Sequence, residues 1–190
     1  MRNLNQIFDK NAIIYKNRTL FWYKKDSSWQ SITWSEVSKE KKTLIYILKT
    51  LKIKKNDKIA IISPNSPKWC IADLSIMSLG AITVPGYTTS NEDELLYLLN
   101  HSESKIVFLS SEILPKFDKI KKKLLYLKHV ICFDEFNKKY NKLAILNYED
   151  LLIKYNNKEV KHYEKEVKVE KKDLACIIYT SGTSARPKGV

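Results

Sequence analysis

The stretch IIYTSGTSARPKGV, from Ile177 to Val190, gathers side chains suited to hold a phosphate group. An apolar run that predicts a strand ends at Tyr179, and a loop rich in hydroxyl groups follows it. Gly182 can adopt backbone angles closed to other residues, so successive N–H groups can turn inward around an anion. Lys188 adds a mobile positive charge, and the short hydroxyl donors are Thr180, Ser181, Thr183 and Ser184. The pattern predicts a phosphate-binding loop, with an ordinary polar turn as the alternative.

The composition of the chain sets this loop apart. The 190 residues contain only four glycines and three arginines, yet two of these glycines and one arginine fall within the last nine positions. Pro187 and Gly189 flank Lys188, whereas the P-loop pattern G-x-x-x-x-G-K-[ST] has glycine before the lysine and a hydroxyl residue after it. The sequence therefore indicates a phosphate loop of another kind.

Short apolar strands alternate with amphipathic helices over most of the chain. Leu20–Tyr23 and Trp29–Thr33 predict a hairpin, after which Thr33 and Glu36 form a capping-box pattern before a helix. The further strands expected are Lys58–Ser63, Ala81–Val84, Lys105–Leu109, Val130–Phe133 and Leu174–Tyr179. Between them we expect helices after Ser66, over Asn91–His101, through a lysine-rich segment to Leu127, and over Tyr148–Tyr155, and a charged, solvated connection before the final strand.

Serial strand–helix units predict an α/β fold, a mostly parallel sheet flanked by helices. Ligands of such sheets bind outside the carboxyl ends of the strands, where the loop after Tyr179 would lie. The apolar stretch Trp69–Tyr87 carries Asp73 and is interrupted by Gly80 and Pro85, so we interpret it as a buried helix and a strand, with a membrane span as the alternative. We expect Trp69 and Tyr87 to be core or structural positions, with a ligand role as the alternative.

Charge and cysteine content limit the function classes. The net charge of +13 comes from 31 lysines and only three arginines, mixed with acidic residues, which disfavours a dedicated nucleic-acid surface. Cys70, Cys132 and Cys176 lie far apart in apolar runs, which predicts neither disulfides nor a metal site and favours a cytoplasmic location. The three histidines show no ligand spacing, and we expect surface or helix-end positions for His101, His129 and His162.

The loop TSGTSARPKGV resembles the signature loop of the AMP-forming adenylating superfamily, usually written TSGTTG followed by PKG. Ala185 stands where the common form has a second glycine, which would strain the loop if that position needs a positive φ. The resemblance extends upstream, in the family's order, through the blocks SITWSEV, NDKIAIISPNSPKWCIADLSIMSLGAITVPGYTT and LNHSESKIVFLS. It implies that residues 1–190 form the first portion of the large N-terminal, AMP-binding domain of an acyl-CoA synthetase.

The resemblance implies a two-step reaction in which a carboxylate and ATP give an acyl-adenylate and pyrophosphate, and coenzyme A then displaces AMP. Thr180, Ser181, Gly182, Thr183, Ser184 and Lys188 would grip the β- and γ-phosphates. The residues expected to bind adenine, Mg²⁺ and the acyl group, and the C-terminal domain with its catalytic lysine, have no counterpart in this sequence. We therefore expect a fragment that is inactive alone.

The blocks SWQSITW and VPGYTTSNEDELLYLLNHSESK resemble the long-chain fatty acyl-CoA synthetase branch more than the acetate, aryl or amino-acid branches. A long-chain fatty acid is thus the expected substrate, and another class of carboxylate is the alternative. The lysine-rich segment Lys116–Lys128 allows two interpretations, a solvated helix face or a peripheral contact with an anionic bilayer. Two different functions also remain open, a non-catalytic α/β binding or regulatory module and a basic nucleic-acid binder.

Overall fold

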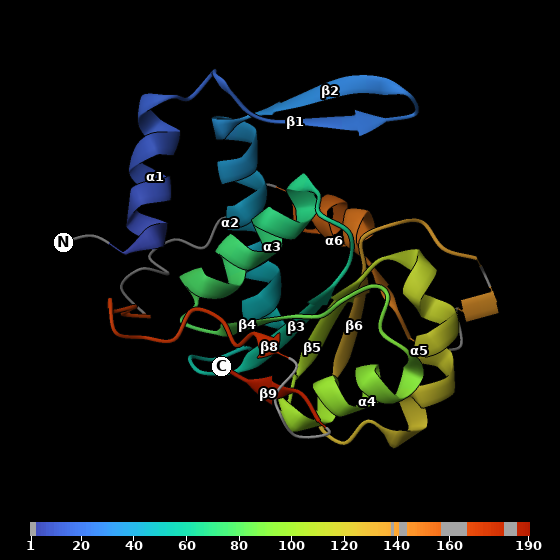
Figure 1. Cartoon of the computed structure of the whole chain (residues 1–190). Coiled ribbons are helices and arrows are strands. Elements are labelled where there is room, and N and C mark those ends of the chain that lie inside the picture. Colours follow the sequence, from blue (N-terminus) through green and yellow to red (C-terminus); the bar gives the residue numbers. More distant parts are fainter. Residues whose placement is uncertain (1–2, 138, 141–143, 157–166, 181–185) are drawn as a thin grey trace.

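A computed structural model describes residues 3–137, 139–140, 144–156, 167–180 and 186–190. Its centre is a five-stranded parallel sheet in the order β4-β3-β5-β6-β7 (Figure 1). The strands are β3 (Lys58–Ile62), β4 (Ile82–Pro85), β5 (Ile106–Leu109), β6 (His129–Cys132) and β7 (Leu146–Asn147). This confirms the predicted α/β class, although the short edge strand β7 was not predicted. The sheet has a doubly wound order: β4 lies on one side of β3, and β5, β6 and β7 follow on the other side, so the winding changes direction between β3 and β5.

Alternate residues of each buried strand face opposite layers of helices. Ile59, Ile61 and Phe108 pack in one core cluster with α1 (Leu4–Ile14), α2 (Trp34–Thr50), α3 (Pro67–Ser78) and α6 (Tyr148–Lys154). Ala60 and Ile62 face a second cluster with α4 (Glu92–His101) and α5 (Leu114–Ile120). Both faces are covered, which explains why the strands read as continuous apolar runs.

Side-chain caps define the starts of several helices. The predicted capping box of Thr33 and Glu36 begins α2, and Ser66 caps α3 with Pro67 at its first position. Asn91 and Glu94 form another capping box on α4. Helix α1, which begins at a capping box of Asn3 and Gln6, was not predicted.

A two-stranded antiparallel hairpin precedes α2. Strand β1 (Thr19–Lys25) pairs with β2 (Ser28–Thr33), as the sequence predicted, and Figure 1 shows the hairpin extending beyond the helices. The turn residues Asp26 and Ser27 both have positive φ, +48° and +65°. Two positive φ values suit a two-residue hairpin, because the turn then matches the twist of its strands.

The lysine-rich helix is shorter than predicted. Helix α5 ends at Ile120, and a 3-10 turn, η2 (Lys121–Lys123), follows it. The Asn100 side chain donates to the Lys123 carbonyl (3.0 Å) and accepts from the Leu125 amide (2.9 Å). These bonds satisfy backbone groups that a longer helix would have paired internally, so the chain leaves the helix there.

The predicted final strand Leu174–Tyr179 is also wrong in part. Thr83 of β4 donates to the Ala175 carbonyl and accepts from the Ile177 amide, which forms a single parallel bridge between Thr83 and Cys176. The next donor on this edge of β4 would be Pro85, and proline has no N–H. The ladder stops there, and β8 (Tyr179–Thr180) pairs instead with β9 (Lys188–Gly189).

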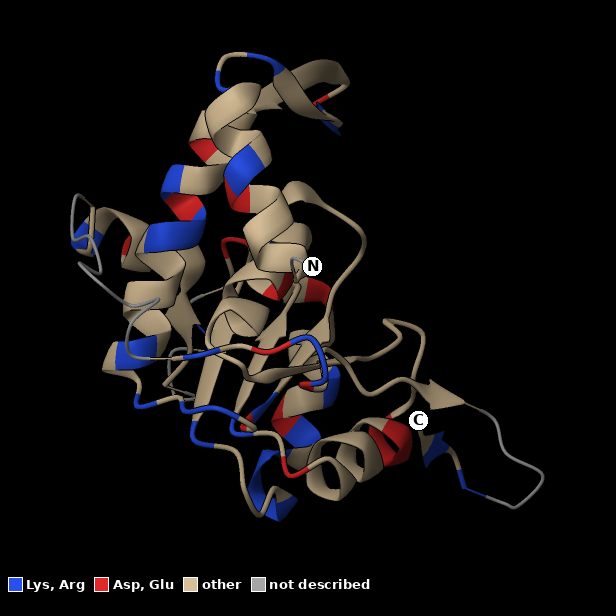
Figure 2. Cartoon of the chain, turned by 90° about the vertical axis from the view of Figure 1, so that its left-hand side faces the viewer, with Lys and Arg blue, Asp and Glu red and all other residues tan. Residues whose placement is uncertain are grey.

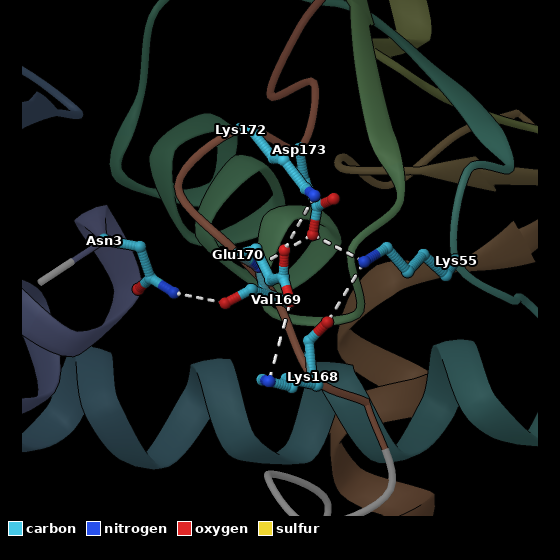
Figure 3. A network of polar contacts seen from close by, with 7 residues as sticks. All are labelled: Asn3, Lys55, Lys168, Val169, Glu170, Lys172 and Asp173. Carbon is cyan, nitrogen blue, oxygen red and sulfur yellow. Dashed lines mark hydrogen bonds and ion pairs between the residues drawn. The ribbon is translucent and has the colours of Figure 1, made fainter.

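Charged residues of both signs are interspersed over the helices and loops (Figure 2). The described end of the predicted solvated connection, residues 167–173, is held against the body by the contacts in Figure 3. Lys55 Nζ contacts Asp173 Oδ2 (2.6 Å) and the Lys168 carbonyl (3.1 Å), and the Asn3 side chain donates to the Val169 carbonyl (2.9 Å). These bonds direct the chain toward the edge of β4.

Trp69–Tyr87 forms α3 and β4, as interpreted from the sequence. In the part of the chain that the structure describes, no helix has the length and apolar character to cross a membrane.

Candidate functional site

The two described arms of the predicted phosphate loop form an antiparallel hairpin. Thr180 of β8 lies directly opposite Lys188 of β9, and Ile178 and Val190 exchange two backbone hydrogen bonds of 2.8 and 2.9 Å. Ser181, Gly182, Thr183 and Ser184, together with Ala185, lie outside the described residues. Of the six predicted phosphate ligands, the structure thus brings Thr180 and Lys188 together at the base of the loop.

This hairpin lies beside the carboxyl end of β4. Ala175–Ile177 runs parallel to β4 at Thr83, so residues 178–180 continue past the carboxyl end of that strand. The Thr83 hydroxyl donates to Asp73 on α3 (2.6 Å), and burial raises the pKa of Asp73. The base of the loop therefore lies at the carboxyl edge of the sheet, where the sequence placed it.

Aromatic residues of α4 hold both arms of the loop. Tyr97 donates its hydroxyl to the Pro187 carbonyl on the return arm (3.0 Å), and its ring lies under the Arg186 guanidinium at 5.6 Å. On the outgoing arm, the Tyr179 hydroxyl lies 2.7 Å from His101 Nδ1. We call these three contacts the loop clamp.

The rings of the loop clamp also contact one another. Tyr97 meets Tyr179 edge-on at 6.3 Å between ring centroids, and His101 meets Tyr179 in the same way at 5.6 Å. Tyr179 is only 8% exposed and belongs to the second core cluster. Burial, and secondarily the neighbouring Tyr97, raises the pKa of Tyr179, so its hydroxyl stays protonated and neutral at physiological pH.

Gly189 is required by close packing inside the hairpin. A Cβ at this position would lie 2.8 Å from Ile177 Cγ2 and 3.4 Å from the ring of Tyr179. The glycine lets β9 approach Ile177 and Tyr179, which keeps Lys188 in register with Thr180. The Lys188 side chain itself is exposed and available to an anionic ligand.

Sequence reasoning missed the loop clamp. His101 is the last residue of α4, as predicted, but it contacts the site. The available signal was the spacing of Tyr97 and His101, four residues apart and hence on one helix face. His129 begins β6, and burial lowers its pKa, whereas His162 lies outside the described residues.

A cavity of about 360 Å³ adjoins the loop base at the ends of β3 and β4. Trp69 is half-buried in its wall, as expected for a structural residue, whereas Tyr87 is 69% exposed, so its predicted core position is wrong. Tyr87 follows Gly86, and by then the chain has left the buried part of the sheet. The lining residues are Ser63, Pro64, Asn65, Trp69, Pro85, Gly86, Tyr87, Thr88, Ile178 and Tyr179.

A second cavity, of about 500 Å³, lies at the change of direction between β3 and β5. It is bounded by Ser63, Ser110 and Asp134 after their strands and by Tyr23 and Lys24 of the β1–β2 hairpin. In the resolved ranges, His, Cys, Asp and Glu form no group of three or more that could hold a metal ion. Cys70, Cys132 and Cys176 are free.

A sequence profile of the family described as "AMP-binding enzyme" matches residues 5–190. The chain belongs to this family. Fatty acyl-CoA synthetase B of Dictyostelium discoideum is 31% identical over 146 residues, which cover 74% of this chain and 21% of the relative. Crotonobetaine/carnitine–CoA ligase of Escherichia coli is 24% identical over 194 residues, which cover all of this chain and 36% of that ligase.

The fold matches that of solved acyl-CoA ligases. The crystal structure of the anthranilate CoA ligase AuaEII in complex with anthranoyl-AMP superposes with a TM-score of 0.84 at 22% identity, over 100% of this chain and 34% of the ligase. The family match over residues 5–190 confirms the predicted resemblance to the adenylating superfamily, and this superposition confirms the fold. The chain spans only about a fifth to a third of the length of these relatives.

Proposed function

We propose that the chain supplies the phosphate-gripping part of an enzyme that activates a carboxylic acid with ATP. A carboxylate oxygen attacks the α-phosphorus, the bond from that phosphorus to the bridging oxygen of the β-phosphate breaks, and pyrophosphate leaves with the electron pair. The thiol of coenzyme A then displaces AMP to give a thioester. The observation that carries the proposal is the clamped hairpin, which sets Thr180 opposite Lys188 at the carboxyl edge of the sheet.

In this proposal Lys188 contributes positive charge to the leaving pyrophosphate, and the hydroxyl and backbone donors of Thr180, Ser181, Gly182, Thr183 and Ser184 orient it. These residues hold and position the leaving group but form no covalent bond with it. Mg²⁺ would neutralise phosphate charge, with ligands outside these 190 residues. Residues 1–190 would thus be part of the large AMP-binding domain and inactive alone.

We further propose a long-chain fatty acid as the acyl substrate. The blocks around Trp29–Trp34 and Val84–Lys105 support this kinship, and Fatty acyl-CoA synthetase B is among the relatives. Relatives named for carnitine and anthranilate chemistry define the competing carboxylate classes. Three free cysteines support a cytoplasmic site of action.

The test is carboxylate-dependent exchange of pyrophosphate into ATP by the natural full-length protein. Lys188→Ala should slow exchange strongly while leaving thioester formation from preformed acyl-adenylate largely intact, because pyrophosphate has left by then. Lys42→Ala, an exposed lysine on α2 at the other face of the sheet, is the matched control. Equal loss in both half-reactions would make Lys188 structural, and absence of exchange with every carboxylate would favour a binding module.

A panel of carboxylates tests the substrate class. Long-chain fatty acids should give the highest kcat/KM in the exchange reaction. If acetate, benzoates or amino acids are adenylated far better, the long-chain proposal fails and the adenylation proposal stands.

A further inference from the structure

The outer face of the β1–β2 hairpin carries two exposed tryptophans, where a solvated hairpin face is ordinarily polar. The register pairs Trp22 with Ser31 and Lys24 with Trp29, so these four residues share one face. Trp22 is 65% exposed and Trp29 is 66% exposed. The opposite face carries Phe21 and Ile32, which pack against the first core cluster. The hairpin therefore uses its inner face for folding and leaves two tryptophans on the outer one.

Basic residues lie near the two tryptophans in the sequence. Lys24 lies on the same face, Lys25 follows it, and Lys16 and Arg18 precede β1. Asp26 is the only acidic residue between positions 16 and 31, so this segment has a net charge of +3. Figures 1 and 2 show the hairpin protruding from the body of the molecule, where a flat surface could reach it.

We propose that this outer face docks on an anionic phospholipid bilayer. Tryptophan rings favour the headgroup level of a bilayer, because one end of the indole is apolar and the N–H stays hydrated. Lys24 on this face and Lys25 next to it complement the negative surface, and their long stems allow the charges to remain among the phosphates. This inference concerns where the protein binds and does not depend on the proposed chemistry.

The residues of the outer face fit a nucleic acid less well than a bilayer. The face offers one lysine and no arginine, and the nearest arginine, Arg18, already lies over the ring of Tyr15 at 5.4 Å. The cavity beside the hairpin is lined in part by acidic Glu40, Glu112 and Asp134, which would repel a nucleic-acid backbone led into it.

The hairpin is also a better bilayer contact than the lysine-rich segment singled out in the sequence. Helix α5 ends at Ile120, and Lys119 and Lys121 pair with Glu92 and Asp118. The exposed Leu125 precedes β6, at the amino edge of the sheet, whereas the hairpin borders the cavity at the carboxyl edge. A flat bilayer could not engage both edges at once.

Sedimentation of the natural full-length protein with lipid vesicles tests the proposal. We expect stronger binding to phosphatidylcholine mixed with phosphatidylserine than to phosphatidylcholine alone. Trp22→Ser with Trp29→Ser should lower the affinity for mixed vesicles about tenfold or more, since two indoles lose their interfacial contact. Lys24→Gln with Lys25→Gln should weaken binding to mixed vesicles and reduce its salt dependence.

The matched control is Leu125→Ser with Tyr126→Ser, which removes exposed apolar groups from the lysine-rich segment and should leave binding unchanged. Thermal melting verifies that each variant folds, and Trp22→Phe with Trp29→Phe should retain more binding than the serine pair. Absence of vesicle binding, loss confined to the Leu125 and Tyr126 variant, or tryptophan-dependent binding to single-stranded DNA without vesicle binding would each overturn the proposal. The proposed adenylation is unaffected by any of these results, because pyrophosphate exchange is measured without lipid vesicles.

Discussion

Removing a single hydroxyl, with Tyr97→Phe, tests whether the loop clamp positions the phosphate loop. The substitution deletes the 3.0 Å bond to the Pro187 carbonyl and keeps the ring against Tyr179 and under Arg186. A neutral hydrogen bond contributes about 0.5–1.5 kcal/mol, equivalent to about twofold to tenfold in an equilibrium constant. Pro187 is only half-buried, so water can replace part of the bond and the lower half of this range is expected.

The assay is pyrophosphate exchange by the natural full-length protein as a function of ATP concentration. Tyr97→Phe should raise the KM for ATP about twofold to fivefold with little change in kcat, because the loop remains intact but is less often in its binding position. Tyr97→Ala also removes the ring contacts, each worth about 0.5–1.5 kcal/mol, and should have an effect of tenfold or more. Tyr46→Phe, in the ring pair with Tyr155, is the matched control.

Two results together would refute the reasoning: Tyr97→Phe leaves the KM for ATP unchanged, and Tyr97→Ala lowers only the melting temperature. Equal impairment of thioester formation from preformed acyl-adenylate would refute it as well, since no pyrophosphate is held in that step. The phenylalanine variant keeps the half-buried ring, so loss of folding should not obscure its result.

Three further predictions concern packing and reactivity. Tyr148→Phe removes the 2.7 Å hydrogen bond to Glu40 and should lower the free energy of unfolding by about 1–3 kcal/mol at neutral pH, measured by denaturant melts. Burial raises the pKa of Glu40, so its carboxyl takes up a proton in the folded state as the pH falls. The loss of unfolding free energy should therefore shrink at lower pH. Gly189→Ala should lower the melting temperature, at a cost of about 1–3 kcal/mol, because its Cβ would meet a neighbour at 2.8 Å. With iodoacetamide at neutral pH, mass spectrometry should find the exposed Cys176 modified and Cys132 unmodified, since burial raises the pKa of Cys132 to about 11; early labelling of Cys132 would contradict this.

Much of the sheet was predictable because its signals are local. Strands buried on both faces, such as Lys58–Ile62, read as short apolar runs, and side-chain caps such as Ser66 and Asn91 announce the helices between them. These signals come from residues within a few positions of one another, so periodicity and capping chemistry suffice to find them.

The errors arose where a distant residue decides the outcome. Helix α5 ends at Ile120 because Asn100, more than twenty positions upstream, takes over the hydrogen bonds of the following backbone. The final strand makes one bridge because Pro85, about ninety positions upstream, offers no N–H. Neither cause can be inferred from the segment that it affects.

The candidate site also has a part that could be predicted from the sequence and a part that could not. The residue types of the loop were readable because glycine, hydroxyls and lysine suit a phosphate wherever the loop is placed. Its support was not readable, because Tyr97 and Pro187 are 90 positions apart and His101 and Tyr179 are 78 apart. Only the folded chain shows that one face of α4 serves both arms of the loop.

Tyr179 belongs both to the hydrophobic core and to the base of the loop. Its ring is buried in the second core cluster, while its hydroxyl contacts His101 and its backbone begins the arm that sets Thr180 opposite Lys188. An exposed lysine on a free loop would sample many positions, and ordering it on a ligand would cost conformational entropy. Anchoring the base of the loop through a core residue reduces that cost before the ligand arrives. The position of Lys188 therefore depends on the packing of α4 against the sheet as well as on the loop sequence.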